Sequence, residues 1–80
     1  MTATERQWVA FLQACKARAI YANELRTNVA AVLNCRSWQE MTRDQVGTLI
    51  RIVNECTRKG DAAIHEIAGR YAEITGADSN

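Results

Sequence analysis

The chain has 80 residues, enough for one domain with a single hydrophobic core. Its net charge of +1 differs from the strong basic excess that dedicated nucleic-acid-binding domains usually carry. No apolar run reaches membrane-spanning length, and the first residues lack the apolar stretch of a secretory signal. We therefore expect a cytoplasmic protein with no membrane partner.

The small net charge hides an uneven distribution along the chain. Residues 1–36 carry a balance of +3, and residues 61–80 carry a balance of −3. Opposite charges on the first and last segments favour packing of these segments against each other, either within one chain or between two copies.

The first predicted element is a long helix over about residues 5–33. The first 46 residues contain no glycine and the whole chain contains no proline, so no residue type in this segment forces a helix to stop. Trp8, Cys15, Ala22 and Val29 recur every seven residues along one apolar seam. Such a helix would be about 44 Å long. Asn34 is a residue type that can end it in a left-handed conformation.

Two capping boxes fit the start of this helix. One pairs Thr2 with Glu5 and the other pairs Thr4 with Gln7, since each has the Ser/Thr-x-x-Glu/Gln spacing. Both alternatives put the first apolar residue of the seam in the second turn.

Two shorter helices are predicted over about residues 43–59 and 62–75. The first begins at the Thr42–Gln45 capping box and is expected to end at Gly60, and the second is expected to end at Gly76. The predicted fold is all-α: a small three-helix bundle in which the two shorter helices pack back on the long one. Residues 1–80 form one helical domain, with 1–3 and 77–80 expected to be frayed.

The sequence offers little material for catalysis or for binding a metal. Cys15, Cys35, Cys56 and His65 are the ligand types of a Cys₃His zinc site, but they lack the close Cys-x₂₋₄-Cys spacing of structural zinc sites. His65 is the only histidine, and no nucleophile signature surrounds the cysteines. We therefore predict no enzyme activity, no metal, no cofactor and three reduced thiols.

A nucleic-acid-binding role is the alternative. The segment 64–71 resembles the first helix of a helix-turn-helix, but only four residues follow Gly76, too few for a recognition helix. A small DNA-associated transcriptional regulator therefore remains the second hypothesis.

The favoured hypothesis is a protein–protein interaction module that acts as a regulator, adaptor or inhibitor of an unknown partner protein. An alanine-rich domain of this size has little large apolar area to bury alone, so we expect a homodimer formed through the long helix. Small proteins of this kind are common among phage and mobile-element accessory proteins. The candidate interface residues lie away from the apolar seam or interrupt it, and they are Val9, Arg18, Ile20, Tyr21 and Arg26.

Overall fold

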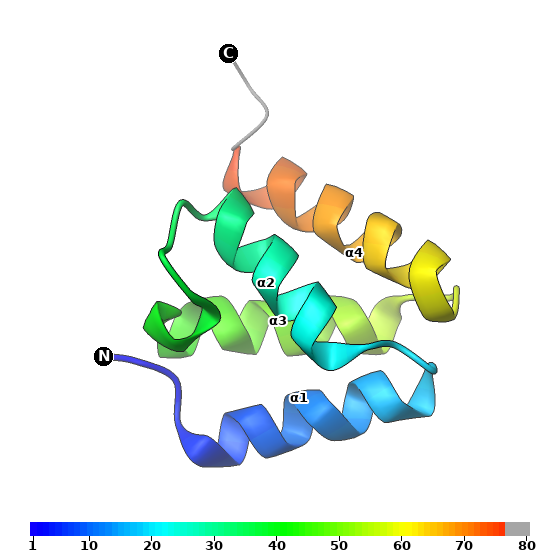
Figure 1. Ribbon diagram of the computed structural model, residues 1–80, viewed down its shortest axis with the longest axis horizontal. Coiled ribbons are helices and arrows are strands. Elements are labelled where there is room, and N and C mark those ends of the chain that lie inside the picture. Colours follow the sequence, from blue (N-terminus) through cyan, green and yellow to red (C-terminus); the bar gives the residue numbers. More distant parts are fainter. Residues whose placement is uncertain (77–80) are drawn as a thin grey trace.

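The computed structural model describes residues 1–76, and its regular structure is entirely helical apart from one isolated β-bridge. The described part contains four α-helices and one short 3₁₀ helix (Figure 1). The all-α class is confirmed, whereas the three-helix count is wrong. The elements are α1 (Glu5–Ala17), α2 (Ala22–Val32), η1 (Trp38–Glu40), α3 (Arg43–Glu55) and α4 (Gly60–Thr75).

The predicted long helix is divided into α1 and α2 by a turn at residues 18–21. Ala19 adopts a left-handed conformation with φ of 54°. The N–H groups of Ala19 and Ile20 donate to the carbonyls of Lys16 and Cys15, at 3.2 and 3.0 Å. This is the Schellman arrangement that ends many helices, formed here around an alanine instead of a glycine.

Tertiary contacts explain why the chain turns at this point. A helix of about 44 Å would find no partner of equal length in so short a chain. Turning at Ala19 folds α2 back beside α1, and Ile20 becomes buried at the corner, with 7% of its surface exposed. The prediction that one helix spans residues 5–33 is therefore wrong, because it followed local helix propensity and no local residue signals the turn.

The end of α2 follows the sequence prediction. Asn34 is left-handed, with φ of 62°, and Cys35 N–H donates to the Ala30 carbonyl at 2.8 Å. The chain then passes through the 3₁₀ helix η1, whose start is capped by the Ser37 hydroxyl accepting from Gln39 N–H.

The third helix, α3, ends at Glu55, four residues before the predicted end. Cys56 is already extended, and the Arg18 side chain donates to the carbonyls of Asn54 and Cys56 at 2.7 and 3.1 Å. Arg18 thereby satisfies carbonyls that a longer helix would have bonded itself. Gly60, predicted as the stop of this helix, begins α4 with φ of 61° and donates its N–H to the Arg18 carbonyl.

The start of the chain, where the sequence predicts fraying of residues 1–3, makes backbone hydrogen bonds to the segment before α3. Thr2 forms an antiparallel bridge with Thr42, in which Ala3 N–H donates to Met41 and Arg43 N–H donates to Met1. Of the two possible first caps, Thr4 with Gln7 is the one formed. The predicted fraying of 77–80 lies outside the described residues.

The helices form two hairpins that pack face to face. α1 packs on α3 and α2 packs on α4, and consecutive helices also touch within each hairpin. In Figure 1, α1 and α3 run in one direction, whereas α2 and α4 run in the opposite one. The core lies between the hairpins, and its large buried side chains include Phe11, Leu25, Met41, Leu49, Ile52, Ile67 and Tyr71.

The two hairpins share the same spacing of helix boundaries up to the start of their second helices. Adding 38 to the bounds of α1 gives the bounds of α3, and adding 38 to the first residue of α2 gives the first residue of α4. Both first helices carry a Thr-x-x-Gln capping box. The buried residues of α1 also recur in α3, since Phe11, Ala14 and Cys15 match Leu49, Ile52 and Val53. The described part of the molecule therefore consists of two hairpins with similar helix boundaries, caps and buried positions.

Candidate functional site

The five predicted interface residues lie in different environments. Val9 and Tyr21 are exposed, at 47% and 75%. Ile20 is buried at the corner between α1 and α2, so the expectation that its side chain faces outward is wrong. Arg18 has a structural role, because it caps the end of α3. Arg26 lies on a half-buried aromatic surface.

That surface consists of Trp8 of α1, Arg26 of α2 and Trp38 of η1, and we call it the tryptophan surface. The Arg26 guanidinium carbon lies 3.4 Å from the Trp38 ring centroid and 5.2 Å from that of Trp8. The two indoles meet edge to face, with centroids 4.9 Å apart and planes at 76°. Each contact has the geometry of a favourable cation–π or aromatic pair.

Neighbouring side chains hold this surface in one conformation. Trp8 also packs edge to face on the buried Phe11, with centroids 5.4 Å apart. Arg26 donates through its Nε to the Asn23 side-chain oxygen at 2.9 Å, and its terminal nitrogen donates to the same oxygen. Partial burial lowers the pKa of Arg26, while the nearby Cys15 opposes that shift. The Arg26 guanidinium is thus held by hydrogen bonds to Asn23 and by its contacts with the two indoles.

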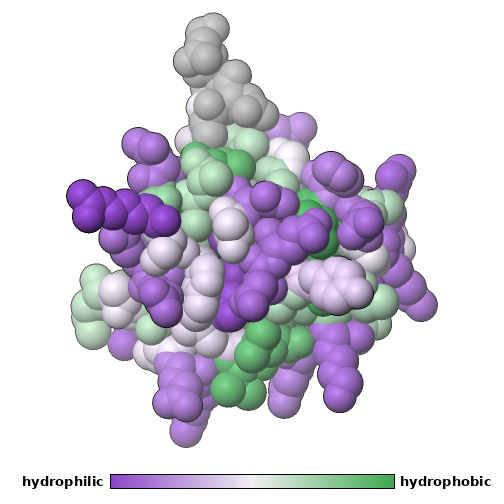
Figure 2. All heavy atoms as spheres, viewed as in Figure 1, coloured by the Kyte–Doolittle hydropathy of each residue, from purple (hydrophilic) through white to green (hydrophobic). Residues whose placement is uncertain are grey.

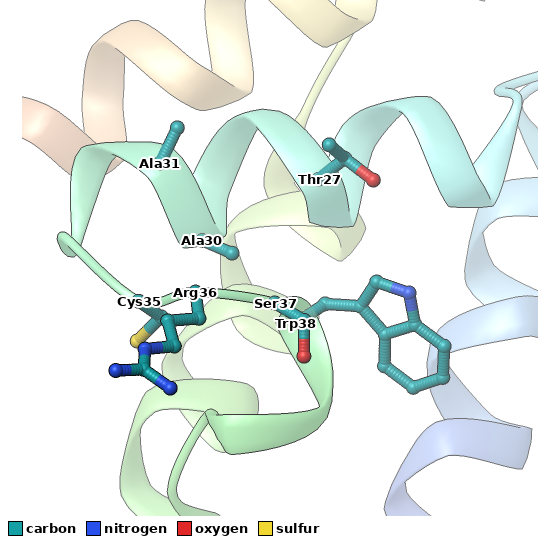
Figure 3. Close-up of a pocket in the computed structure, with 7 residues that line it drawn as sticks. All are labelled: Thr27, Ala30, Ala31, Cys35, Arg36, Ser37 and Trp38. Carbon is teal, nitrogen blue, oxygen red and sulfur yellow. The ribbon is translucent and has the colours of Figure 1, made fainter.

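A shallow pocket of about 350 Å³ lies beside Trp38, between α2 and the segment that leads into η1. Figure 3 shows Trp38 at the end of the pocket toward α1, with Cys35 and Arg36 at the other end. The residues that α2 contributes to its lining are small, and they are Thr27, Ala30 and Ala31. The pocket therefore continues the tryptophan surface along α2.

A second exposed apolar area lies on α1. Figure 2 shows an apolar patch over the middle of this helix, where Val9 and Leu12 are the large exposed apolar residues, at 47% and 43%. Val9 and Leu12 are three residues apart, so they lie on the same face of α1.

The three thiols are unpaired and differ in their surroundings. Cys15 and Cys56 are buried, and Cys35 is half-buried at the pocket. Burial raises the pKa of the Cys15 thiol to about 11, although Arg26 and Arg18 nearby favour the thiolate. Burial also raises the pKa of Cys56. Raised pKa values disfavour the nucleophilic thiolate, so Cys15 and Cys56 suit packing better than catalysis.

No group of three His, Cys, Asp or Glu side chains within residues 1–76 is placed to hold a metal ion. His65 is exposed on α4, as predicted for an ordinary surface residue. Over the same residues, no helix is long and apolar enough to cross a membrane.

Sequence reasoning identified Arg26 and Val9 but gave no site role to Trp8 or Trp38. Trp8 fits the apolar seam of its helix, and Trp38 lies 30 residues away in a connector, so nothing in the sequence pairs them. The available signal is composition: Trp and Arg are the residues most enriched in protein interfaces, and this chain has only two tryptophans.

Comparisons with known proteins give no match to a family model, to a curated protein or to a solved structure.

Proposed function

We propose that this protein is a protein–protein interaction module that binds a partner protein through the tryptophan surface. The observation that carries the proposal is the Arg26 guanidinium stacked on the half-buried Trp38 indole and close to the half-buried Trp8 indole, beside a pocket. Interfaces concentrate their binding energy in a few Trp, Tyr and Arg residues in well-packed positions. A surface already held in one conformation also loses little side-chain entropy on binding.

The pocket gives this surface a place for a partner side chain. Its lining combines the apolar residues Ala30, Ala31 and Trp38 with polar groups of Thr27, Ser37 and Arg36. Protein interfaces likewise combine apolar and polar groups. We propose that a partner inserts an apolar side chain here, next to Trp38.

The biological role that we propose is that of a small regulator, adaptor or inhibitor. A single compact domain of 80 residues can act on a larger protein by covering one of its surfaces. A phage or mobile-element accessory protein is one class of this size. Three unpaired thiols support a reducing compartment such as the cytoplasm.

The test compares capture of host proteins by the wild-type chain and by the variants Trp38→Ala and Arg26→Ala. Arg51→Ala is the matched control, since Arg51 is exposed on α3 and makes no part of the tryptophan surface. A protein retained by wild type and control but lost with both variants is then purified and titrated by calorimetry. Truncation of an interface hot spot costs about 2 kcal/mol or more, so we expect affinity to fall about thirtyfold or more.

Equal capture by all four chains would contradict the proposal. Retention of the wild-type chain on heparin that disappears with salt, together with no variant-sensitive protein, would favour the DNA-associated alternative instead.

A further inference from the structure

Four exposed residues form a stripe along the outer side of α1. They are Glu5, Val9, Leu12 and Lys16, spaced by four, three and four residues, and this spacing places them on one face of a helix. The stripe is acidic at its first residue, apolar in the middle and basic at its last residue. We call it the α1 stripe.

Within residues 1–76, no hydrogen bond or ion pair joins a side chain of the α1 stripe to another residue. Val9 and Leu12 leave 47% and 43% of their surfaces exposed. Each of the two ion pairs found within residues 1–76 joins α4 to α3 or to the segment after α3, so neither includes Glu5 or Lys16. Apolar and charged groups that face solvent together in this order are available to a second molecule.

The order of acidic, apolar and basic residues makes the α1 stripe complementary to a second α1 stripe that runs in the opposite direction. In an antiparallel pair of α1 helices related by a two-fold axis midway between Val9 and Leu12, Glu5 of one chain faces Lys16 of the other. The same register places Val9 of one chain against Leu12 of the other. Each contact occurs twice, which is the self-complementary arrangement that a two-fold dimer requires.

We propose that the partner of the α1 stripe is a second copy of this chain, bound antiparallel in this register. The paired apolar residues form the centre, and two Glu5–Lys16 ion pairs close its ends. A mixed-charge end pattern selects the antiparallel orientation, because a parallel pair would place like charges together. The proposal extends the proposed function by adding a second copy as a partner, and it uses none of the residues of the tryptophan surface.

Sedimentation velocity on the full chain tests the proposal. One pair of three-turn helices buries less area than a standard interface, so we expect a dimer with a dissociation constant of about 100 µM or below. Glu5→Lys and Lys16→Glu each bring like charges together twice per dimer, so each should weaken association at least about tenfold at low salt.

The decisive measurement mixes these two variants. Glu5→Lys chains carry two lysines on the stripe and Lys16→Glu chains carry two glutamates, so a one-to-one mixture should form a heterodimer although neither chain associates alone. The double variant E5K/K16E should recover the homodimer to within about threefold of wild type. Glu24→Lys, an exposed change on α2, is the matched control and should leave association unchanged.

Changes in the stability of α1 alone cannot produce this pattern of lost and recovered association. Both substitutions place charge unfavourably at an end of α1, so the double variant has the weakest isolated helix and should nevertheless regain the dimer. Circular dichroism checks that each variant remains folded. A monomeric wild-type chain at about 1 mM would overturn the proposal, and so would a mixture that stays monomeric or single variants that associate as wild type does. These outcomes leave the test of the tryptophan surface unaffected, since Trp38 and Arg26 are unchanged.

Discussion

Ala19 adopts backbone angles that cost an L-residue about 1–2 kcal/mol relative to the right-handed region. Glycine does not have this cost, although it gains more freedom in the unfolded chain. We therefore expect Ala19→Gly to raise the free energy of unfolding by about 1 kcal/mol, measured by urea denaturation.

The same substitution two residues earlier is the control for this prediction. Ala17 is the last residue of α1 and is right-handed, so Ala17→Gly should lower the free energy of unfolding by about 0.5–1 kcal/mol. If Ala19→Gly destabilised the protein as Ala17→Gly does, the left-handed turn between α1 and α2 would be wrong.

The buried thiol of Cys15 predicts a loss of stability at alkaline pH. Its pKa is raised by burial from about 9.0 to about 11, so the unfolded chain loses this proton at a lower pH than the folded protein does. The stabilisation is fully present below pH 9 and is lost as the pH rises through about 11. Urea denaturation between pH 7 and pH 11 should therefore show a falling free energy of unfolding.

Removal of the thiol identifies the group that is responsible. Cys15→Ala should be less stable at pH 7 because it opens a small cavity, but its stability should fall less steeply above pH 9. Tyr71, whose pKa burial raises to about 12, accounts for part of the remaining slope. Equal slopes for wild type and Cys15→Ala would rule out the assignment to Cys15.

At the scale of elements, Arg18 links the turn after α1 to the end of α3. Its positively charged guanidinium donates two hydrogen bonds to carbonyls that the helix leaves unpaired. We expect Arg18→Ala to lower the free energy of unfolding by about 1.5–3 kcal/mol, measured by thermal and urea denaturation. Arg51→Ala, at an exposed position within α3, should change it by less than about 0.5 kcal/mol. Similar losses for both variants would show that Arg18 does not cap α3.

Helix ends that depend on nearby residues were predictable from the sequence. The Thr42–Gln45 box, the left-handed Asn34 and the left-handed Gly76 are all formed as expected. The two ends that differ, at Ala17 and Glu55, depend on residues 36 or more positions away, because the Arg18 backbone and side chain meet the segment 54–60. Sequence spacing contains no signal for such a contact.

The candidate site follows the same rule. The sequence singles out Arg26 because it interrupts an apolar seam, whereas its contacts with Trp8 and Trp38 depend on α2 folding back beside α1. A single helix over residues 5–33 would place Trp8 and Arg26 about 27 Å apart along its axis. Because the sequence does not indicate the turn between α1 and α2, it does not indicate the tryptophan surface either.

At the scale of the whole molecule, neither hairpin can bury its apolar residues alone. α1 packs on α3 and α2 packs on α4, so the apolar residues of each hairpin are buried against the other hairpin. We therefore expect one cooperative unfolding transition. Both tryptophans lie in the first 38 residues, whereas far-ultraviolet circular dichroism reports on all helices. The urea transitions seen by fluorescence and by circular dichroism should coincide, and a fluorescence transition that precedes the loss of helix would contradict this expectation.

The correspondence between the hairpins has a consequence for how copies of the chain can associate. A shift of 38 residues takes the α1 stripe to Arg43, Gly47, Ile50 and Asn54 on α3. If these four residues of α3 matched the α1 stripe, every molecule would have two self-complementary surfaces. Copies could then associate through both surfaces into open-ended filaments. On α3, glycine in place of Val9 leaves Ile50 as the one large apolar residue at the centre. Asparagine in place of Lys16 removes the basic end, and arginine in place of Glu5 makes the acidic end basic. This difference between α1 and α3 limits the proposed assembly to a closed pair and leaves no second self-complementary surface through which filaments could grow.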